Sequence, residues 1–171
     1  YKHYKDMPED VRKSIAATYS GEKINGLEWK LFGSMWGAGD FKNAIIENYI
    51  DISKGLDQIP LSGNLTKSHY DNFLLHFKKT FPTGNPLATA TRLLAMKRPD
   101  TFVCIDNKNK KDLCKAFGLK VSHLNLDNYW DKIIERIFDS NWWQSPAPMT
   151  DKDTRIANFR SAFLDAIYYE P

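Results

Sequence analysis

One acidic side chain, Asp106, stands between an apolar pentapeptide at residues 101–105 and a run of polar and basic residues. A carboxylate in such a position can stabilise the positive charge that a sugar acquires as its base leaves, and it can orient the attacking water. The same carboxylate can instead cap the helix that follows, which stabilises a protein by roughly 1 kcal/mol without any catalysis. The residue types leave both roles of Asp106 open, and Asn107 and Asn109 fit either role.

A short hairpin, Phe-Pro-Thr-Gly-Asn-Pro at residues 81–86, separates two segments with helical periodicity. The unpaired amides and the dipole at the start of the second helix would favour a phosphate group there. We therefore expect Thr83, Gly84 and Asn85 to contact the backbone of a nucleic acid.

Basic side chains are unevenly distributed, although the formal net charge of the chain is only +3. Such clustering permits an anionic partner, and a solvated helix face is the alternative explanation. Trp142 and Trp143 either stack on unpaired bases, where each stacked base contributes about 1 to 3 kcal/mol, or belong to a loop packed on the core. From the basic cluster, which Lys115 and Lys120 extend, we expect DNA contacts from Lys97, Arg98, Lys108, Lys110 and Lys111.

The elements that must position these residues are helical, because apolar residues recur mostly at spacings of three and four. The periodicity predicts an all-α single domain over residues 1–171. Residues 139–148 are expected to form an irregular loop rich in aromatic residues and proline. Eight helices are expected, near residues 8–21, 27–32, 40–59, 66–80, 86–98, 107–117, 130–137 and 150–167.

The last of these helices carries an apolar stripe made of Ile156, Phe159, Phe163 and Ile167. Thr150 followed by Asp153 resembles a capping box at its start. We expect the stripe to face the core, so that Phe163→Ala would cost roughly 3 to 5 kcal/mol of stability.

The composition excludes several classes of protein. No stretch approaches the roughly 18 uninterrupted apolar residues of a membrane span, and the first residues show no secretory pattern, so a cytoplasmic protein without membrane contact is expected. Cys104 and Cys114 are too few for a disulfide framework and are expected to be reduced core thiols. His69 and His76 share a helix face without a third ligand, so neither a metal nor a cofactor is expected. The chain begins without a methionine and ends directly after a helical pattern, which is typical of a piece of a longer protein with other domains.

The hairpin, the small residues at 88–90 and the apolar run that ends at Asp106 resemble the helix-hairpin-helix DNA glycosylases. The resemblance covers about residues 66–118. In that superfamily a Pro-Gly-x-Gly hairpin opens a helix with a small-residue pair, and an extended segment then delivers the catalytic aspartate. The resemblance implies a helical glycosylase-like scaffold, DNA as the partner, and Asp106 as the catalytic residue of any glycosylase activity.

This chain departs from the family pattern at two places. The hairpin glycines of the family fall on Thr83 and Asn85, with Gly84 between them. The nucleophilic lysine of the members that also cut the DNA backbone falls on Leu87. Because leucine cannot form a Schiff base, lyase chemistry is not expected at this position.

Three functions are compatible with these patterns. The first is a DNA-binding helical module with a glycosylase-like scaffold, for example the recognition part of a restriction or phage-defence protein. The alternative is a monofunctional DNA glycosylase that uses Asp106. The second alternative is a protein-interaction domain, since a mild positive charge is not specific for DNA.

Overall fold

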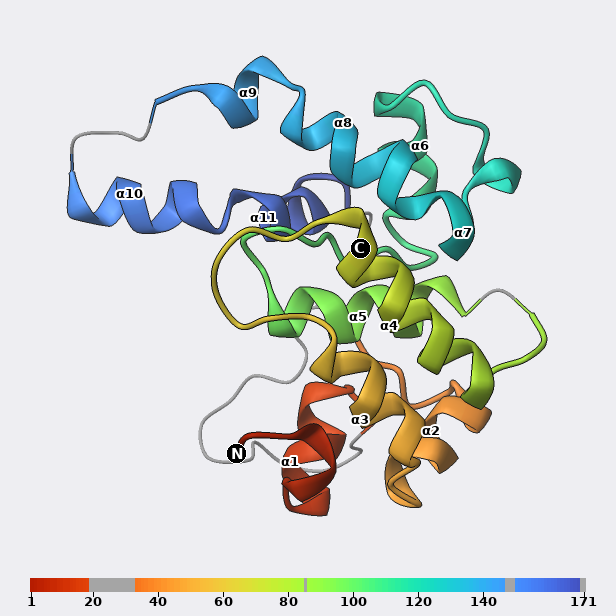
Figure 1. Cartoon of the computed structure of the whole chain (residues 1–171). Coiled ribbons are helices and arrows are strands. Elements are labelled where there is room, and N and C mark those ends of the chain that lie inside the picture. Colours follow the sequence, from red (N-terminus) through yellow and green to blue (C-terminus); the bar gives the residue numbers. More distant parts are fainter. Residues whose placement is uncertain (19–32, 85, 147–149, 170–171) are drawn as a thin grey trace.

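The computed structural model describes residues 1–18, 33–84, 86–146 and 150–169 (Figure 1). These residues form helices and connecting turns, and none of them lies in a β-strand, so the predicted all-α class is confirmed for them. The α-helices are α1 (Glu9–Ile15), α2 (Gly39–Ile46), α3 (Ile50–Asp57), α4 (Lys67–Thr80), α5 (Leu87–Lys97), α6 (Lys110–Ala116), α7 (Leu126–Tyr129), α8 (Glu135–Phe138), α9 (Asn141–Gln144), α10 (Asp151–Asn158) and α11 (Arg160–Ile167).

Shorter turns complete the architecture. Two 3-10 turns, η1 (Tyr4–Asp6) and η2 (Val121–His123), precede α1 and α7. A π-helical turn, η3 (Trp130–Ile134), joins α7 to α8 without a break. Within the described ranges, no helix has both the length and the apolar character needed to cross a membrane.

The α4–α5 pair forms the centre of the molecule, with α1–α3 on one side and α6–α8 on the other (Figure 1). The buried face of α4 supplies an aromatic ladder in which Tyr70, Phe73 and Phe77 are each fully buried. The ring centroids of Phe73 and Phe77 are 5.2 Å apart, and Tyr70 also contacts Tyr129 at 5.8 Å. This packing joins α4 to α7 through Tyr129, and to the segment that follows α5 through a ring contact of Tyr70 with Phe102.

The helices are more numerous and shorter than predicted, and left-handed residues explain two of the differences. Asn48 has φ +56° and divides the helix expected over residues 40–59 into α2 and α3. Ala17, with φ +54°, ends the first helix before the expected end near residue 21. The helix expected at 27–32 lies outside the described residues. Residues 139–148, expected to be irregular, contain the helical turn α9.

The apolar stripe of the C-terminal helix does not face the core, so that prediction is wrong. The chain breaks at Phe159 between α10 and α11, and the ring of Phe163 is 45% exposed. Leu164, Asp165 and Ser161 are buried instead. Phe163→Ala should therefore lower the stability by less than the roughly 3 to 5 kcal/mol predicted, because that value applies to a buried ring.

An extended segment, residues 102–105, follows the turn after α5 and is fully buried without a neighbouring strand in the described chain. Side chains bind its backbone groups instead. The Tyr129 hydroxyl donates to the Val103 carbonyl at 2.8 Å and accepts from the Val103 amide at 3.0 Å. The Ile105 amide donates to Thr91 Oγ1 at 3.0 Å. Because unpaired backbone groups are costly in a core, these side chains stabilise the extended path that leads to Asp106.

Candidate functional site

Asp106 closes the turn of residues 107–109 that leads into α6. Its Oδ1 atom accepts hydrogen bonds from the amides of Lys108, at 2.7 Å, and Asn109, at 3.3 Å. The Asp106 amide in turn donates to Asn109 Oδ1 at 3.0 Å, which gives the reciprocal pattern of a capping box. The Lys110 amide already donates to the Asp106 carbonyl at 3.0 Å. The Asp106 carboxylate therefore has a structural role in the turn before α6, whereas the cap position of α6 itself is occupied by Asn109.

The second carboxylate oxygen of Asp106, Oδ2, accepts none of these hydrogen bonds. Within the part of the chain that the structure describes, no donor forms a hydrogen bond with Oδ2. The backbone of Gly33 passes close to it, so that a Cβ atom built at Gly33 would lie 3.2 Å from Oδ2. Gly33 also has φ +76°, so a side chain there would be strained as well as crowded. Asp106 thus combines a structural oxygen with one that can still accept a hydrogen bond.

A buried amide, Asn109, connects Asp106 to a second carboxylate. The Asn109 side chain is 0% exposed, and its Nδ2 atom donates to the Cys104 carbonyl at 2.8 Å and to Asp165 Oδ1 at 2.5 Å. Burial raises the pKa of Asp165 to about 6, and the negative charge of Asp106 adds to this effect. The Asn109 hydrogen bond and the Arg92 charge oppose it. This network ties α11 to the turn that carries Asp106.

Arg92 lies beneath this network and is 0% exposed. Its Nε atom donates to the Ile15 carbonyl, and its Nη1 atom donates to the Gly33 carbonyl, both at 3.1 Å. Burial lowers the pKa of Arg92, whereas the charges of Asp165 and Asp106 raise it. Arg92 therefore binds carbonyl groups on both sides of the connection between α1 and α2. Its positive charge offsets part of the negative charge of Asp106 and Asp165.

Sequence reasoning missed both Asp165 and Arg92. An arginine within the apolar run LATATRLLAM of α5 is a signal that could have been found, because a charged residue on a buried helix face needs partners. Asp165 carries no comparable signal, because the apolar stripe predicted that a different face of α11 would be buried. Both cysteines are buried and free, as predicted, and burial raises the pKa of the Cys104 thiol.

The path of the chain brings Asp106 back toward the hairpin. After α5 the Phe102 amide donates to the Arg98 carbonyl, so the chain reverses there, and Ile105 then bonds to Thr91 one turn from the start of α5. Asp106 follows at the end of α5 that begins at Leu87. Lys97 and Arg98 lie at the opposite end, roughly 16 Å away for a helix of this length.

The hairpin itself is exposed at Thr83 and Gly84, and Gly84 has φ +81°. Asn85, the third predicted phosphate contact, lies outside the described residues. A polar depression of about 400 Å³ lies between the hairpin and the turn that starts α7. Lys78 and Asp127 form an ion pair at this depression, so the positive charge of Lys78 is partly neutralised there.

The predicted basic cluster is divided in space, because three of its members bind the protein itself. Lys97 Nζ donates to the Leu56 carbonyl at 2.5 Å, and Lys110 Nζ donates to the Leu124 carbonyl at 3.1 Å. Arg98 is buried, pairs with Asp100 through Nε at 2.8 Å and Nη2 at 2.6 Å, and also binds the carbonyls of Pro60 and Gly63.

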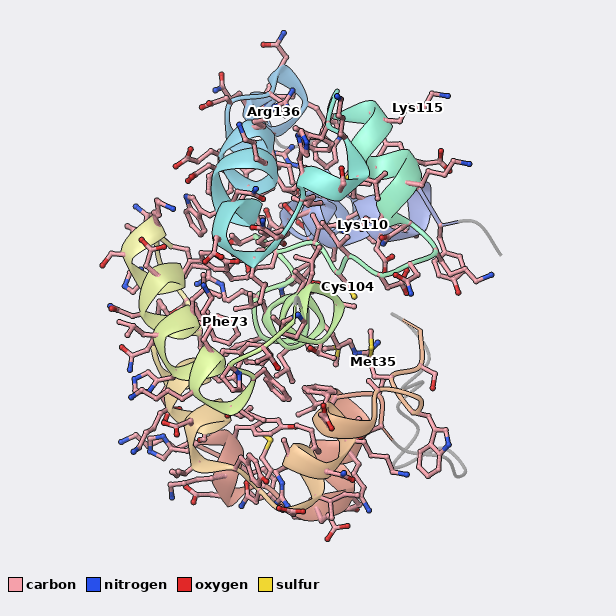
Figure 2. All side chains as sticks on the ribbon, turned by 90° about the vertical axis from the view of Figure 1, so that its right-hand side faces the viewer. Met35, Phe73, Cys104, Lys110, Lys115 and Arg136 are labelled. Atoms are coloured by element: carbon pink, nitrogen blue, oxygen red, sulfur yellow. The ribbon has the colours of Figure 1, made fainter. Side chains whose placement is uncertain are left out.

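Lys108 and Lys111 are the members of the cluster that remain exposed near Asp106. Neither ammonium group pairs with a carboxylate among the described residues. Figure 2 views the side on which the α4–α5 connection lies, with Lys115 at the outer surface of α6 and Cys104 in the interior beside α5. Lys108, in the turn before α6, and Lys111, in the first turn of α6, form the exposed edge of α6.

The tandem tryptophans differ in their surroundings. Trp143 packs against Phe138, with ring centroids 5.2 Å apart, and the Arg160 guanidinium lies over its ring at 4.7 Å. Trp142 is 42% exposed and lines a depression of about 410 Å³ beside the C-terminal end of α6. Trp143 thus packs against the core, whereas Trp142 stays more exposed, with the same Arg160 guanidinium 5.7 Å from the centre of its ring.

No family model, curated protein or solved structure matches this chain. The likeness to the helix-hairpin-helix DNA glycosylases therefore depends on the hairpin and the residues up to Asp106, and it stays a prediction. Among the described residues, no three His, Cys, Asp or Glu side chains lie where they could hold one metal ion.

Proposed function

We propose that this chain is a DNA-binding helical module that contacts backbone phosphates at the hairpin end of α5 and along the edge of α6. The observation that carries the proposal is the exposure of Lys108, on the turn after Asp106, and of Lys111, in the first turn of α6. Thr83 and Gly84 belong to the hairpin at the same end of α5. The proposed surface is smaller than the sequence suggested, because Lys97 and Arg98 are excluded from it.

The contacts of such a surface would be largely independent of sequence. Lysine binds phosphate as a point charge, and each neutralised phosphate releases counterions from the DNA. The proposed scaffold is glycosylase-like. It would act beside other domains, for example as the recognition part of a restriction or phage-defence protein. Two free, buried cysteines support a reducing compartment such as the cytoplasm.

Charge reversal of the exposed lysines tests this proposal. Lys108→Glu combined with Lys111→Glu is expected to weaken the affinity for double-stranded DNA at low salt by at least about tenfold, since two attractive contacts become repulsive. Fluorescence anisotropy with a labelled duplex measures the change. The matched control is Lys54→Glu with Lys152→Glu, which reverses two exposed charges on α3 and α10. Equal losses in the two double variants would contradict a specific surface on α6.

A second candidate function, a monofunctional DNA glycosylase, is favoured by the free Oδ2 atom of Asp106. A carboxylate inside a basic surface repels phosphate, so it weakens a site that only binds DNA. It would instead stabilise a sugar cation and orient water during base release. Asp106 offers this oxygen while Oδ1 and the backbone keep the turn in place.

Asp106→Asn separates the two functions. Asparagine retains most of the capping ability of aspartate, so the variant should unfold within about 1 kcal/mol of the parent. We expect no base release by the parent from damaged or modified duplexes, and a DNA affinity of the variant at least equal to that of the parent, because the substitution removes a charge that repels phosphate. Base release by the parent that falls by about a hundredfold in the variant would establish the glycosylase function instead.

The protein-interaction alternative is favoured by a different surface. Ile156, Phe159, Phe163 and Ile167 are each 44% exposed or more, on the two helices at the C-terminal side. Exposed apolar patches of this kind often mark contacts with another protein. Ile156 and Phe163 line one depression of this region, whereas Ile167 lines another beside the end of α6.

A further inference from the structure

We infer that DNA binding at the α6 edge is coupled to the uptake of one proton by Asp165, through the buried network that joins Asp165, Asn109 and Asp106. This inference rests on the proposed DNA-binding function and concerns the regulation of the same site. It makes the affinity for DNA depend on pH in addition to salt.

The geometry connects Asp165 directly to the proposed DNA contacts. Asp165 Oδ1 accepts from Asn109 Nδ2 at 2.5 Å, and Asn109 Oδ1 accepts from the Asp106 amide at 3.0 Å. Asp106 Oδ1 accepts from the amide of Lys108, which is a proposed phosphate contact, at 2.7 Å. A change of charge at Asp165 therefore occurs within a continuous hydrogen-bonded network that ends at the DNA surface.

Two charged groups and one neutral thiol surround Asp165, on three neighbouring segments. Asp106 faces it from the turn before α6, Arg92 faces it from α5, and the Cys104 thiol lies near it in the extended segment. Arg92 already donates to the carbonyls of Ile15 and Gly33. Two carboxylates thus share one buried cation, and a phosphate placed beside Asp106 would add a further negative charge.

The direction of the coupling follows from these charges. Burial and Asp106 already raise the pKa of Asp165 to about 6, so its proton is lost just below neutral pH in the free protein. DNA phosphates would raise this pKa further, because a nearby negative charge disfavours the ionised carboxyl. The complex should hold the proton at a pH where the free protein releases it, so affinity should increase as pH falls. One linked proton changes the affinity by at most about tenfold per pH unit.

One histidine offers a competing explanation. His123 is exposed on η2, which packs beside α6. Histidine side chains in general gain positive charge as pH falls, and positive charge strengthens binding to DNA. A test must therefore separate His123 from Asp165.

The experiment compares four proteins on one duplex at fixed ionic strength, at about pH 7.5 and about pH 5.5. They are the parent, Asp165→Asn, His123→Gln and the control Asp112→Asn, which removes a carboxylate from α6 itself. We expect the parent and Asp112→Asn to bind several-fold more tightly at the lower pH, and His123→Gln to keep most of this change. Asp165→Asn should bind alike at both pH values, with the tighter affinity of the parent at low pH.

Calorimetry in two buffers of different ionisation enthalpy then counts the protons taken up by the parent and by Asp165→Asn. Uptake by the parent that disappears in the variant supports the inference. A pH dependence that survives in Asp165→Asn, or disappears in His123→Gln, would overturn it while leaving the DNA-binding function intact. Absence of DNA binding by the parent at both pH values would instead contradict the proposed function, and the inference with it. Circular dichroism confirms that each variant is folded.

Discussion

Asn109→Ala is expected to lower the free energy of unfolding by about 3 to 5 kcal/mol, because three buried partners lose their hydrogen bonds at once. The side chain of Asn109 is fully buried and binds the Cys104 carbonyl, the Asp165 carboxyl and the Asp106 amide. Each buried polar group left without a partner costs about 1 to 3 kcal/mol.

Urea denaturation followed by circular dichroism measures this loss. Asn107→Ala is the matched control, because Asn107 lies two residues away and is exposed. Its change should stay within about 0.5 kcal/mol, as is usual for exposed positions. Equal effects of the two substitutions would mean that the Asn109 network does not hold the turn together.

Asp165→Asn is expected to stabilise the protein by about 2 to 3 kcal/mol above neutral pH, and to have little effect near pH 4. The folded-state pKa of Asp165 is raised from 3.8 to about 6, chiefly by burial. A carboxyl with a raised pKa contributes its full stability below the unfolded-state value, and the contribution is lost as pH rises through the folded-state value. Asparagine cannot ionise and still accepts the Asn109 hydrogen bond, so it avoids this loss.

The difference in unfolding free energy between variant and parent, measured from pH 4 to 8, checks this prediction. The difference should grow between about pH 4 and pH 6 and then level off. For Asp112→Asn it should stay within about 1 kcal/mol at every pH, since Asp112 lies near the surface at the start of α6. A variant that is less stable than the parent at pH 7.5 would show that the ionised Asp165 is favourable in the fold.

The sequence predicted the helical class and the path to Asp106 more successfully than it predicted the surfaces. Strong apolar periodicity in α4 and α5 located both helices, and their inner faces are buried as expected. Gly118, with φ +63°, ends α6 where it was expected to. These features depend on local patterns, which a sequence displays directly.

The failures arose where distant parts of the chain decide the outcome. Arg98 is buried where it binds the distant carbonyls of Pro60 and Gly63, whereas Lys108 is exposed. The stripe through Phe163 has helical spacing, but the break at Phe159 turns Asp165 inward in its place. Spacing alone fixes which residues share a helix face, whereas tertiary contacts decide which face is buried.

The salt dependence of DNA binding by the parent protein tests the central proposal most directly. Anisotropy titrations of single- and double-stranded DNA, repeated as the salt concentration is raised, give the number of phosphates contacted. We predict binding at low salt whose logarithmic affinity falls linearly with the logarithm of salt concentration, with a slope that corresponds to about two to four phosphates on the duplex. Absence of binding to both forms of DNA at low salt, or an affinity that does not change with salt, would contradict the proposal.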